Sequence, residues 1–317
     1  MKKIALEEHF YIEGFPHPSR DNQADASAAY IDYALPRLPD VDNLRIADMD
    51  RAGIEIAVLS HFAPGPHAER DDAKANIAAQ KGNDGLAAIV ARHPTRYRGF
   101  AMLAMHDPKE AADELDRAVR QLGFKGALLN GHTHGVYLDD PRYLGFWERV
   151  AALDVPIYLH PTHPVTTPAV FEGYPGLGAS MWGWMAETGG HALRLVLSGL
   201  FDRLPRLTIL LGHMGEALPF LLWRIDSRFK IYKPKVALQK PPSHYIRENF
   251  MVTTAGTFAH DPLLCTLSAL GEDRVMFSVD YPLEYSDQAA EFIDTAPLTE
   301  TVRAKVCYGN AARVLKL

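Results

Sequence analysis

Short apolar stretches alternate with amphipathic stretches along almost the whole chain. Between the apolar stretches, hydrophobic residues recur every three or four positions, which indicates helices. The run 54–62 (IEIAVLSHF) has almost no polar residue until its end, which is typical of strands buried on both faces of a parallel sheet. The pattern predicts eight strands, at residues 4–10, 54–62, 99–105, 126–130, 155–160, 207–211, 250–254 and 275–278.

Helices are predicted after these strands, and the order predicts the fold. Strict alternation of eight strands with helices is typical of a (β/α)8 TIM-type barrel, here a single α/β domain over residues 1–317. A doubly wound open sheet is the alternative, but the turn after the first strand lacks a glycine-rich phosphate motif. The polar stretch 11–41 is predicted to be an inserted loop after strand 1. The predicted helices cover residues 42–53, 71–91, 108–122, 141–153, 183–200, 217–229, 262–270, 286–294 and 300–315.

The composition of the chain excludes some classes of protein. The chain has 317 residues, of which 47% are hydrophobic and 23% are charged, as in ordinary globular enzymes. Its net charge of −6 argues against a nucleic-acid partner. Cys265 and Cys307 are too few and too far apart to indicate a disulfide framework or a thiolate metal site. With no apolar run of transmembrane length and no signal sequence, we expect a cytoplasmic protein without a membrane partner.

Ionisable residues collect at the ends of the predicted strands, which is where barrels of this kind gather their active sites. Glu7 and His9 end the first strand, and strand alternation places both on one face with Glu8 on the other. Glu8 has no predicted role. The other candidates at this end of the barrel are His160, His213, Glu216 and Asp280.

Carboxylates and imidazoles together bind divalent transition metals, and without thiolates the identity of the ion stays open between Mn²⁺ and Zn²⁺, with Mg²⁺ less favoured. A shell of two imidazoles and two carboxylates would suit one divalent ion and leave room for water or substrate. Taken singly, each residue could be a core histidine, a salt-bridge partner or a turn former, but their common position favours a site. That shell would consist of Glu7, His9, His160 and Asp280, whereas no direction can be predicted for His61, His132, His134 and His163.

Several motifs resemble the ACMSD-like branch of the amidohydrolase superfamily, named after aminocarboxymuconate-semialdehyde decarboxylase. They are Glu7-x-His9, Tyr158-Leu-His160-Pro161, Leu211-Gly-His213-Met-Gly-Glu216, Trp223-Arg224-Ile-Asp226 and Phe277-Ser-x-Asp280-Tyr-Pro282. The segment Glu187-Thr-Gly-Gly-His191-Ala-Leu-Arg194 resembles the hydroxybenzoate decarboxylases, which include the γ-resorcylate and 2,3-dihydroxybenzoate enzymes.

The resemblance implies a metal-dependent, non-oxidative decarboxylase that acts on a small aromatic carboxylic acid. It implies a homodimer or homotetramer with the insert, residues 11–45, at an interface. It assigns metal binding to Glu7, His9, His160 and Asp280, catalysis to His213 and Glu216, and substrate binding to Arg224 and to Arg45, the latter across a subunit interface.

Two departures from hydrolase relatives bear on the reaction. Typical amidohydrolases carry His-x-His on strand one and lysine on strand four, where this chain has Glu7 and, nearby, Asn130. The alternative, a metal-dependent hydrolase or hydratase acting on a lactone or an unsaturated dicarboxylate, is therefore the weaker hypothesis. For decarboxylation, we assign protonation of the ring carbon to Asp280.

Overall fold

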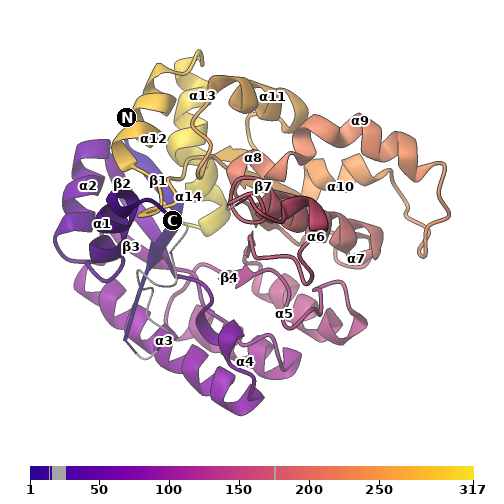
Figure 1. Cartoon of the computed structure of the whole chain (residues 1–317), viewed down its shortest axis with the longest axis horizontal. Helices are drawn as coiled ribbons and strands as arrows, with labels where there is room; N and C mark the ends of the chain where they lie inside the picture. Colours follow the sequence, from indigo (N-terminus) through magenta and orange to yellow (C-terminus); the bar gives the residue numbers. More distant parts are fainter. Residues whose placement is uncertain (14, 16–25, 175) are drawn as a thin grey trace.

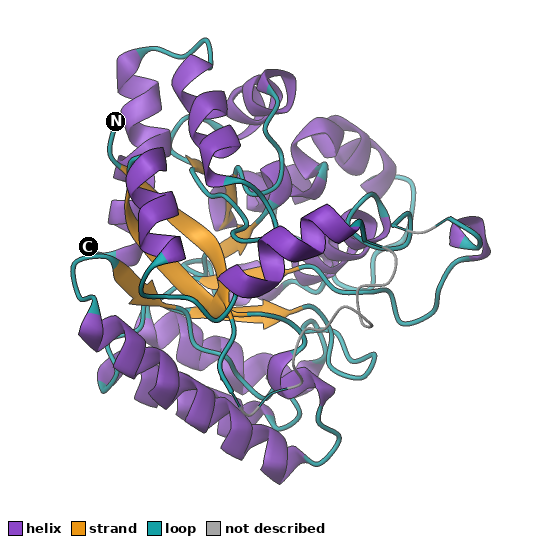
Figure 2. Ribbon diagram, turned by 60° about the vertical axis from the view of Figure 1, so that its left-hand side comes forward, coloured by secondary structure: helices purple, strands orange, loops and turns teal. Residues whose placement is uncertain are grey.

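In the part of the chain that the structure describes, eight parallel strands form the centre and helices surround them (Figures 1 and 2). The structure is a computed structural model that describes residues 1–13, 15, 26–174 and 176–317. Strands β1–β2–β3 form one sheet and β4–β5–β6–β7–β8 form another, each in sequence order. The strands are β1 (Lys3–Phe10), β2 (Ile54–His61), β3 (Tyr97–Gly99), β4 (Ala127–Asn130), β5 (Ile157–His160), β6 (Ile209–Leu211), β7 (Phe250–Thr253) and β8 (Val275–Met276).

Two isolated bridges join these sheets into a ring. Ala101, just after β3, pairs in parallel with Ala127 of β4, and Glu8 of β1 pairs in parallel with Tyr281 after β8. At the second junction, the backbone N–H of Asp280 donates to the carbonyl of Glu7 over 3.0 Å. The ring confirms the predicted (β/α)8 barrel, and its closure sets the segment after β8 against the end of β1.

The interior of the barrel is filled by apolar side chains rather than forming a pore. Every strand or its immediate extension contributes to this buried cluster. Fully burying one such side chain contributes about 1.5–3 kcal/mol, so the cluster stabilises the interior of the barrel below the ends of the strands. Its members from the strands are Ile4, Leu6, Ile56, Val58, Phe100, Leu128, Tyr158, Leu210, Met251 and Met276.

The helices cover the outside of the strands (Figure 2). In α4, the Asp107 side chain accepts from the backbone N–H groups of Lys109 and Glu110, and Pro108 occupies the first turn, so the sequence itself specifies the start of this helix. The helices are α1 (Ala28–Arg37), α2 (Leu44–Ala52), α3 (Asp72–Arg92), α4 (Pro108–Arg120), α5 (Leu144–Leu153), α6 (Gly183–Leu197), α7 (Leu200–Arg203), α8 (His213–Glu216), α9 (Leu218–Phe229), α10 (Pro242–Asn249), α11 (His260–Leu270), α12 (Ser286–Thr295), α13 (Glu300–Ala304) and α14 (Asn310–Leu315). Short 3-10 turns are η2 (Gly65–Ala68), η3 (Pro141–Tyr143) and η4 (Ala169–Phe171), and η5 (Lys305–Gly309) is π-helical.

The structure corrects several element predictions. The stretch 11–41 is not all loop, because it contains α1, although its residues 14 and 16–25 lie outside the described part of the chain. The third strand ends at Gly99, and the apolar residues 100–105 are buried without a continuous ladder. α10 was not predicted, and the helix predicted for 300–315 is divided by η5. Within the described residues, no helix is both long and apolar enough to cross a bilayer.

Candidate metal centre and active site

An irregularity in β1 turns its polar end into the barrel. Ile4 and Leu6 belong to the interior cluster, so uninterrupted alternation would point Glu7 and His9 outward. The pairing register with β2 shifts within residues 5–8, and such a bulge changes which face later residues occupy. Glu7 and His9 share a face, as the sequence predicted, and the bulge makes that face the inner one.

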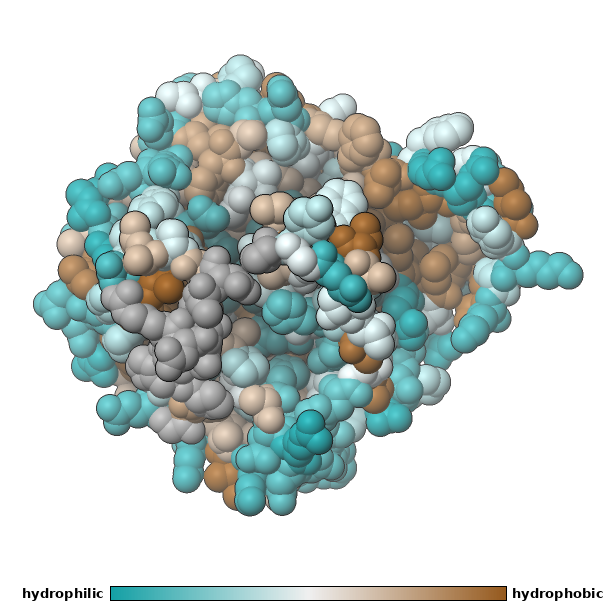
Figure 3. Space-filling model, viewed as in Figure 1, coloured by the Kyte–Doolittle hydropathy of each residue, from teal (hydrophilic) through white to brown (hydrophobic). Residues whose placement is uncertain are grey.

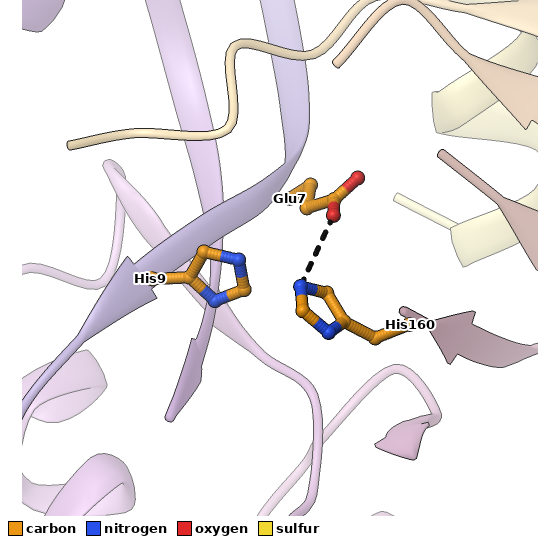
Figure 4. Close-up of side chains that lie close together, drawn as sticks. All are labelled: Glu7, His9 and His160. Carbon is orange, nitrogen blue, oxygen red and sulfur yellow. Dashed lines mark ion pairs between the residues drawn. The ribbon is translucent and has the colours of Figure 1, made fainter. Parts of the chain in front are cut away.

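Glu7 and His9 meet His160, which comes from the opposite side of the barrel at the end of β5 (Figure 4). One potential ligand atom from each lies within 4.8 Å of the others, and Glu7 Oε1 is 3.4 Å from His160 Nε2. Asp280 completes the group, with its Oδ1 3.2 Å from His9 Nε2. Glu7, His213 and Asp280 form a second group with the same spacing. The structure therefore brings all four predicted metal ligands together.

The donor atoms fit a divalent ion. Glu7 Oε1, His9 Nε2 and Asp280 Oδ1 are all buried, and none of them has a hydrogen-bond partner. A buried polar atom without a partner costs about 1–3 kcal/mol, and more when it is charged, so a shared cation at this point would stabilise all three. Two carboxylates and two imidazoles would give that cation a neutral site.

Burial sets the protonation of these groups. It raises the pKa of Glu7 to about 8, with Asp280 adding to the shift and His213 opposing it. Burial, together with His9, lowers the pKa of His160 to about 3, so its imidazole is neutral and can offer a lone pair. Burial also favours the neutral form of Asp280, but its contacts with His213 and His9 outweigh this and hold its pKa below the usual range.

Neighbouring groups orient Glu7. Its Oε2 accepts a hydrogen bond from the hydroxyl of Tyr158, and that hydroxyl lies 2.8 Å from Thr253 Oγ1. The backbone of Gly212 passes so close that an added Cβ would be 2.6 Å from Glu7 Oε2. The carboxylate is therefore held on one side by a phenol and has space only because residue 212 is glycine.

The two imidazoles of this group are oriented through their other ring nitrogens. His160 Nδ1 lies 2.9 Å from the carbonyl of Pro161, and His9 Nδ1 lies 3.2 Å from Ser60 Oγ. The carbonyl of Pro161 can only accept, so it places the hydrogen of His160 on Nδ1 and leaves Nε2 for an ion, while Ser60 holds the ring of His9 in place. Ser60 also lines a buried cavity of about 10 Å³, together with His61 and Asn130.

We expect Ser60→Ala to weaken metal binding by about 10–100-fold, because His9 would lose the group that orients its ring. Competition with a chelator of known affinity measures this. Ser198→Ala is the matched control, since Ser198 Oγ donates only to the carbonyl of Leu195 on the outer helix layer. Equal metal affinities in the two variants would show that the contact between Ser60 and His9 does not position the ligand.

His213 lies between two carboxylates. Its Nδ1 is 2.8 Å from Glu216 Oε1, and its Nε2 is 3.7 Å from Asp280 Oδ2. Burial would lower the pKa of His213, but Glu216, Glu7 and Asp280 together raise it well above its usual value. The imidazole can therefore carry a proton next to Asp280.

The backbone that presents His213 is strained. All five residues of 213–217 have positive φ angles, between 50° and 81°, and Asp280 has a φ of 77°. Conformations of this kind cost of order 1–3 kcal/mol for residues other than glycine and cluster at functional sites. An added Cβ at Gly256 would lie 3.0 Å from His213 Cδ2, so the β7 loop also approaches this ring closely.

Residues 19–317 match the Amidohydrolase family. The chain belongs to that family. It is 43% identical to a "Gamma-resorcylate decarboxylase" of Polaromonas sp. (strain JS666 / ATCC BAA-500) over 328 residues, covering 99% of this chain and 98% of the relative. These matches confirm the resemblance inferred from the sequence motifs.

Two solved structures show the same fold. A 2,6-dihydroxybenzoate decarboxylase complexed with 2,6-dihydroxybenzoate superposes with a TM-score of 0.94 at 40% identity, covering 100% of this chain and 99% of the other. A dihydroxybenzoic acid decarboxylase from Polaromonas sp. JS666, with bound manganese and the inhibitor 2-nitroresorcinol, gives a TM-score of 0.93 at 43% identity, covering 100% and 97%.

In this amidohydrolase, Arg45 is enclosed within its own chain. It is 1% exposed in α2, and its Nη2 donates to the carbonyl of His9. Its guanidinium carbon lies 4.3 Å from the centre of the Tyr281 ring. A charged residue on a helix is usually solvated, but here the junction between β1 and the segment after β8 encloses it. Arg224, by contrast, is exposed on α9, and its side chain has no hydrogen bond or ion pair within the described residues.

Glu8 now has a structural role. Its Oε1 accepts from the N–H of Val279 and from Ser278 Oγ, each over 3.1 Å, and Ser278 Oγ accepts in turn from the N–H of Glu7 over 2.7 Å. Burial raises the pKa of Glu8 to about 8, with these hydrogen bonds and Arg45 opposing the shift. The hydrogen bonds of Glu8 therefore hold β1 against the segment that carries Asp280.

Sequence reasoning missed three groups of this amidohydrolase, namely Ser60, Tyr158 and Thr253. Thr253 is the last residue of β7, Ser60 is the second-last of β2 and Tyr158 is the third-last of β5, and each lies in phase with residues that point inward. Tyr158 stands two positions before His160, so it shares that residue's face. Polar residues in this phase were the signal that could have found them.

Proposed function

We propose that this chain is a single-domain, metal-dependent, non-oxidative decarboxylase of a hydroxylated benzoate in the cytoplasmic catabolism of aromatic compounds. The observation that carries the proposal is the convergence of three buried, unpartnered donor atoms, from Glu7, His9 and Asp280, beside a histidine–carboxylate pair. The relatives that match almost the whole chain are named decarboxylases of such acids. Both cysteines are free thiols, in keeping with a reducing compartment.

The reaction avoids an aryl carbanion. Direct loss of CO2 would leave an unstabilised pair of electrons in the plane of the ring. Protonation of the carbon that bears the carboxylate is easier, because an ortho hydroxyl donates electrons into the ring. The C–CO2 bond then breaks, its electron pair restores aromaticity, and the new C–H bond remains in the product.

Glu7, His9, His160 and Asp280 would hold the divalent ion. When bound, it supplies a Lewis acid and a template for the oxygens of the substrate. The manganese in the Polaromonas relative supports Mn²⁺, and the ligand set also suits Zn²⁺ better than Mg²⁺.

Asp280 would protonate the ring carbon, and His213 would supply Asp280 with the proton. His213 Nε2 faces Asp280 Oδ2, while Glu216 holds Nδ1 in place. The hydroxyl of the bound substrate gives a proton to His213, so the transfer runs from phenol to imidazole, carboxylate and ring carbon. After CO2 leaves, the phenolate of the product takes a proton from water. Asp280 is ionised before substrate binds and neutral at the moment of protonation.

Arg45 would balance negative charge beside the ion. Its Nε and Nη1 atoms are buried without partners, while Nη2 is occupied by the carbonyl of His9. A guanidinium with two N–H groups left over can bind a carboxylate or phenolate. This supports a substrate role for Arg45 from within its own subunit.

Arg224 would bind substrate in a neighbouring subunit of a homodimer or homotetramer. It lies on α9 directly after Trp223 and one turn after Phe220, which are 78% and 80% exposed, and Figure 3 shows hydrophobic side chains gathered over this part of the surface. Exposed aromatic side chains of this size are typical of protein interfaces.

Mixing two inactive variants tests this assignment. We expect Arg224→Ala and Asp280→Asn each to lose activity, and a 1:1 mixture reassembled at random to regain up to about a quarter of the unmodified activity, because one composite site in four then has both groups. Dissociation and reassociation of the two proteins, followed by an activity assay, measures the recovery. No recovery in oligomers shown to be mixed would place Arg224 outside the partner's site.

A panel of substrates tests the function itself. With Mn²⁺-loaded protein, we expect CO2 release from one or more of salicylate, 2,3-, 2,4- and 2,6-dihydroxybenzoate and 5-carboxyvanillate. The hydrolase or hydratase alternative gains no support from the relatives compared above, which are decarboxylases. Addition of water to a lactone or an unsaturated dicarboxylate, without release of gas, would favour that alternative.

A further inference from the structure

Two histidines outside the metal centre point their Nε2 atoms at each other. His106 follows the buried segment after β3, and His134 lies in the loop after β4. Their Nε2 atoms are 3.2 Å apart. The carbonyl oxygen of Glu69, in the connection between β2 and α3, is 2.8 Å from the Nε2 of His106 and 3.2 Å from that of His134. Three successive βα connections thus contribute one donor atom each to a small triangle.

Without an ion, hydrogen bonds at the two Nε2 atoms hold this triangle together. If both imidazoles carry hydrogen on Nε2, both donate to one carbonyl and their N–H dipoles lie side by side. If only one carries hydrogen, that single hydrogen is shared between the carbonyl and the other ring. The opposite nitrogen of His106, Nδ1, is buried without a partner, so no hydrogen bond there fixes the tautomer.

A divalent transition metal uses all three lone pairs. Two nitrogens each about 2.0–2.1 Å from a tetrahedral ion lie about 3.3 Å apart, close to the separation of these two Nε2 atoms. Imidazole ligands select zinc, copper or nickel over calcium or magnesium, which prefer oxygen. With two side-chain ligands and one carbonyl, such an ion keeps at least one position for water.

The surroundings support a built site. His134 has a φ of 49° in the turn between Thr133 and Val136, a conformation that favours glycine or asparagine over histidine. Both ring nitrogens of His67 are buried without partners, and burial together with its neighbours His106 and His134 keeps that ring neutral by lowering its pKa to about 4. Another neutral imidazole therefore stands beside the pair.

His132 shows the contrast. Its Nε2 lies 3.1 Å from the carbonyl of His163, and its Nδ1 accepts from the N–H of Gly135 over 3.1 Å. Both nitrogens are engaged, so His132 has no lone pair for an ion although it is only two residues from His134.

We propose that His106, His134 and the carbonyl of Glu69 form a second, peripheral binding site for a divalent transition-metal ion such as Zn²⁺, which ties together the connections after β2, β3 and β4. The site shares no residue with the Glu7–His9–His160–Asp280 centre. It does not depend on the decarboxylase assignment.

Equilibrium dialysis with Zn²⁺ tests the proposal. Protein stripped by a chelator and dialysed against micromolar Zn²⁺ is expected to bind two ions per chain. His134→Asn, which suits the left-handed turn, combined with His106→Gln, is expected to bind one. Asp280→Asn with His160→Ala is expected to lose the other ion and keep the peripheral one.

His244→Ala is the matched control, because His244 is exposed on α10, where its ring packs against the ring of Tyr245. It is expected to bind two ions, like the unmodified chain. A cooperative thermal unfolding transition of the His106/His134 variant reports that it folds; if the pair does not fold, His134→Asn alone replaces it. The proposal is overturned if the unmodified chain binds only one ion. It is also overturned if the His134 variants still bind two ions, or if His244→Ala binds fewer than two.

Discussion

Replacing Asp280 with asparagine is expected to lower kcat by about 10²–10⁴-fold while the aromatic acid still binds. Asparagine has nearly the same shape but cannot donate a proton to the ring carbon. The backbone of Asp280 is held by its N–H bond to the carbonyl of Glu7, so the substitution keeps the loop in place. Steady-state kinetics at saturating Mn²⁺, together with titration of a nonreactive aromatic acid, separate chemistry from binding.

Saturating metal matters because Asp280 is also a proposed ligand. If the variant bound the ion more weakly, the resulting loss of activity could be mistaken for the loss of a proton donor. Asp261→Asn, in the first turn of α11, controls for the chemical change at another aspartate. A kcat for Asp280→Asn within a few-fold of the unmodified enzyme would remove Asp280 from the proton transfer.

Removing the metal is expected to abolish turnover, and adding Mn²⁺ or Zn²⁺ is expected to restore it. Without an ion, Glu7 Oε1, His9 Nε2 and Asp280 Oδ1 remain buried without partners, and nothing holds the substrate oxygens. Binding should also stabilise the fold, by about 2.7 kcal/mol when the free ion is at a hundred times its Kd. Activity and thermal unfolding, measured before and after chelation, report both effects.

Two adjacent glutamates provide the matched pair for this experiment. Glu7→Gln removes a proposed ligand and is expected to lose the ion, whereas Glu8→Gln changes a carboxylate that contacts Ser278 and Val279 instead. Glu8→Gln should keep its metal content and lose only stability. Full metal-dependent activity in Glu7→Gln, or in chelated protein shown to be free of metal, would contradict the proposed centre.

The fold was largely predictable because the strands are short, apolar and evenly interleaved with helices. The site followed from it, since a closed ring of eight strands brings Asp280 beside Glu7 even though they are far apart in sequence. Alternation correctly placed Glu7 and His9 on one face, but it could not show which face, because the bulge within residues 5–8 leaves no clear mark in the sequence.

Long-range contacts of single side chains were beyond the sequence pattern. The sequence pattern alone would make Arg45 an exposed helix residue. Only the packing of Tyr281, in the segment after β8, against α2 shows that Arg45 is enclosed. The pairing of His106 with His134 depends on the shapes of two loops, which hydrophobic periodicity does not describe. Ser60 and Tyr158 were accessible in principle, because both lie in phase with the inward positions of their strands.

The most direct test follows the carboxyl carbon. The protein loaded with Mn²⁺ is incubated with 2,6-dihydroxybenzoate labelled with ¹³C in its carboxylate, and the gas and the aromatic product are analysed. We predict labelled CO2 and an equal amount of resorcinol, with neither formed by chelated protein. If this acid and the other hydroxybenzoates of the panel are left unchanged by metal-loaded, folded protein, or are altered without release of labelled CO2, the proposed function is wrong.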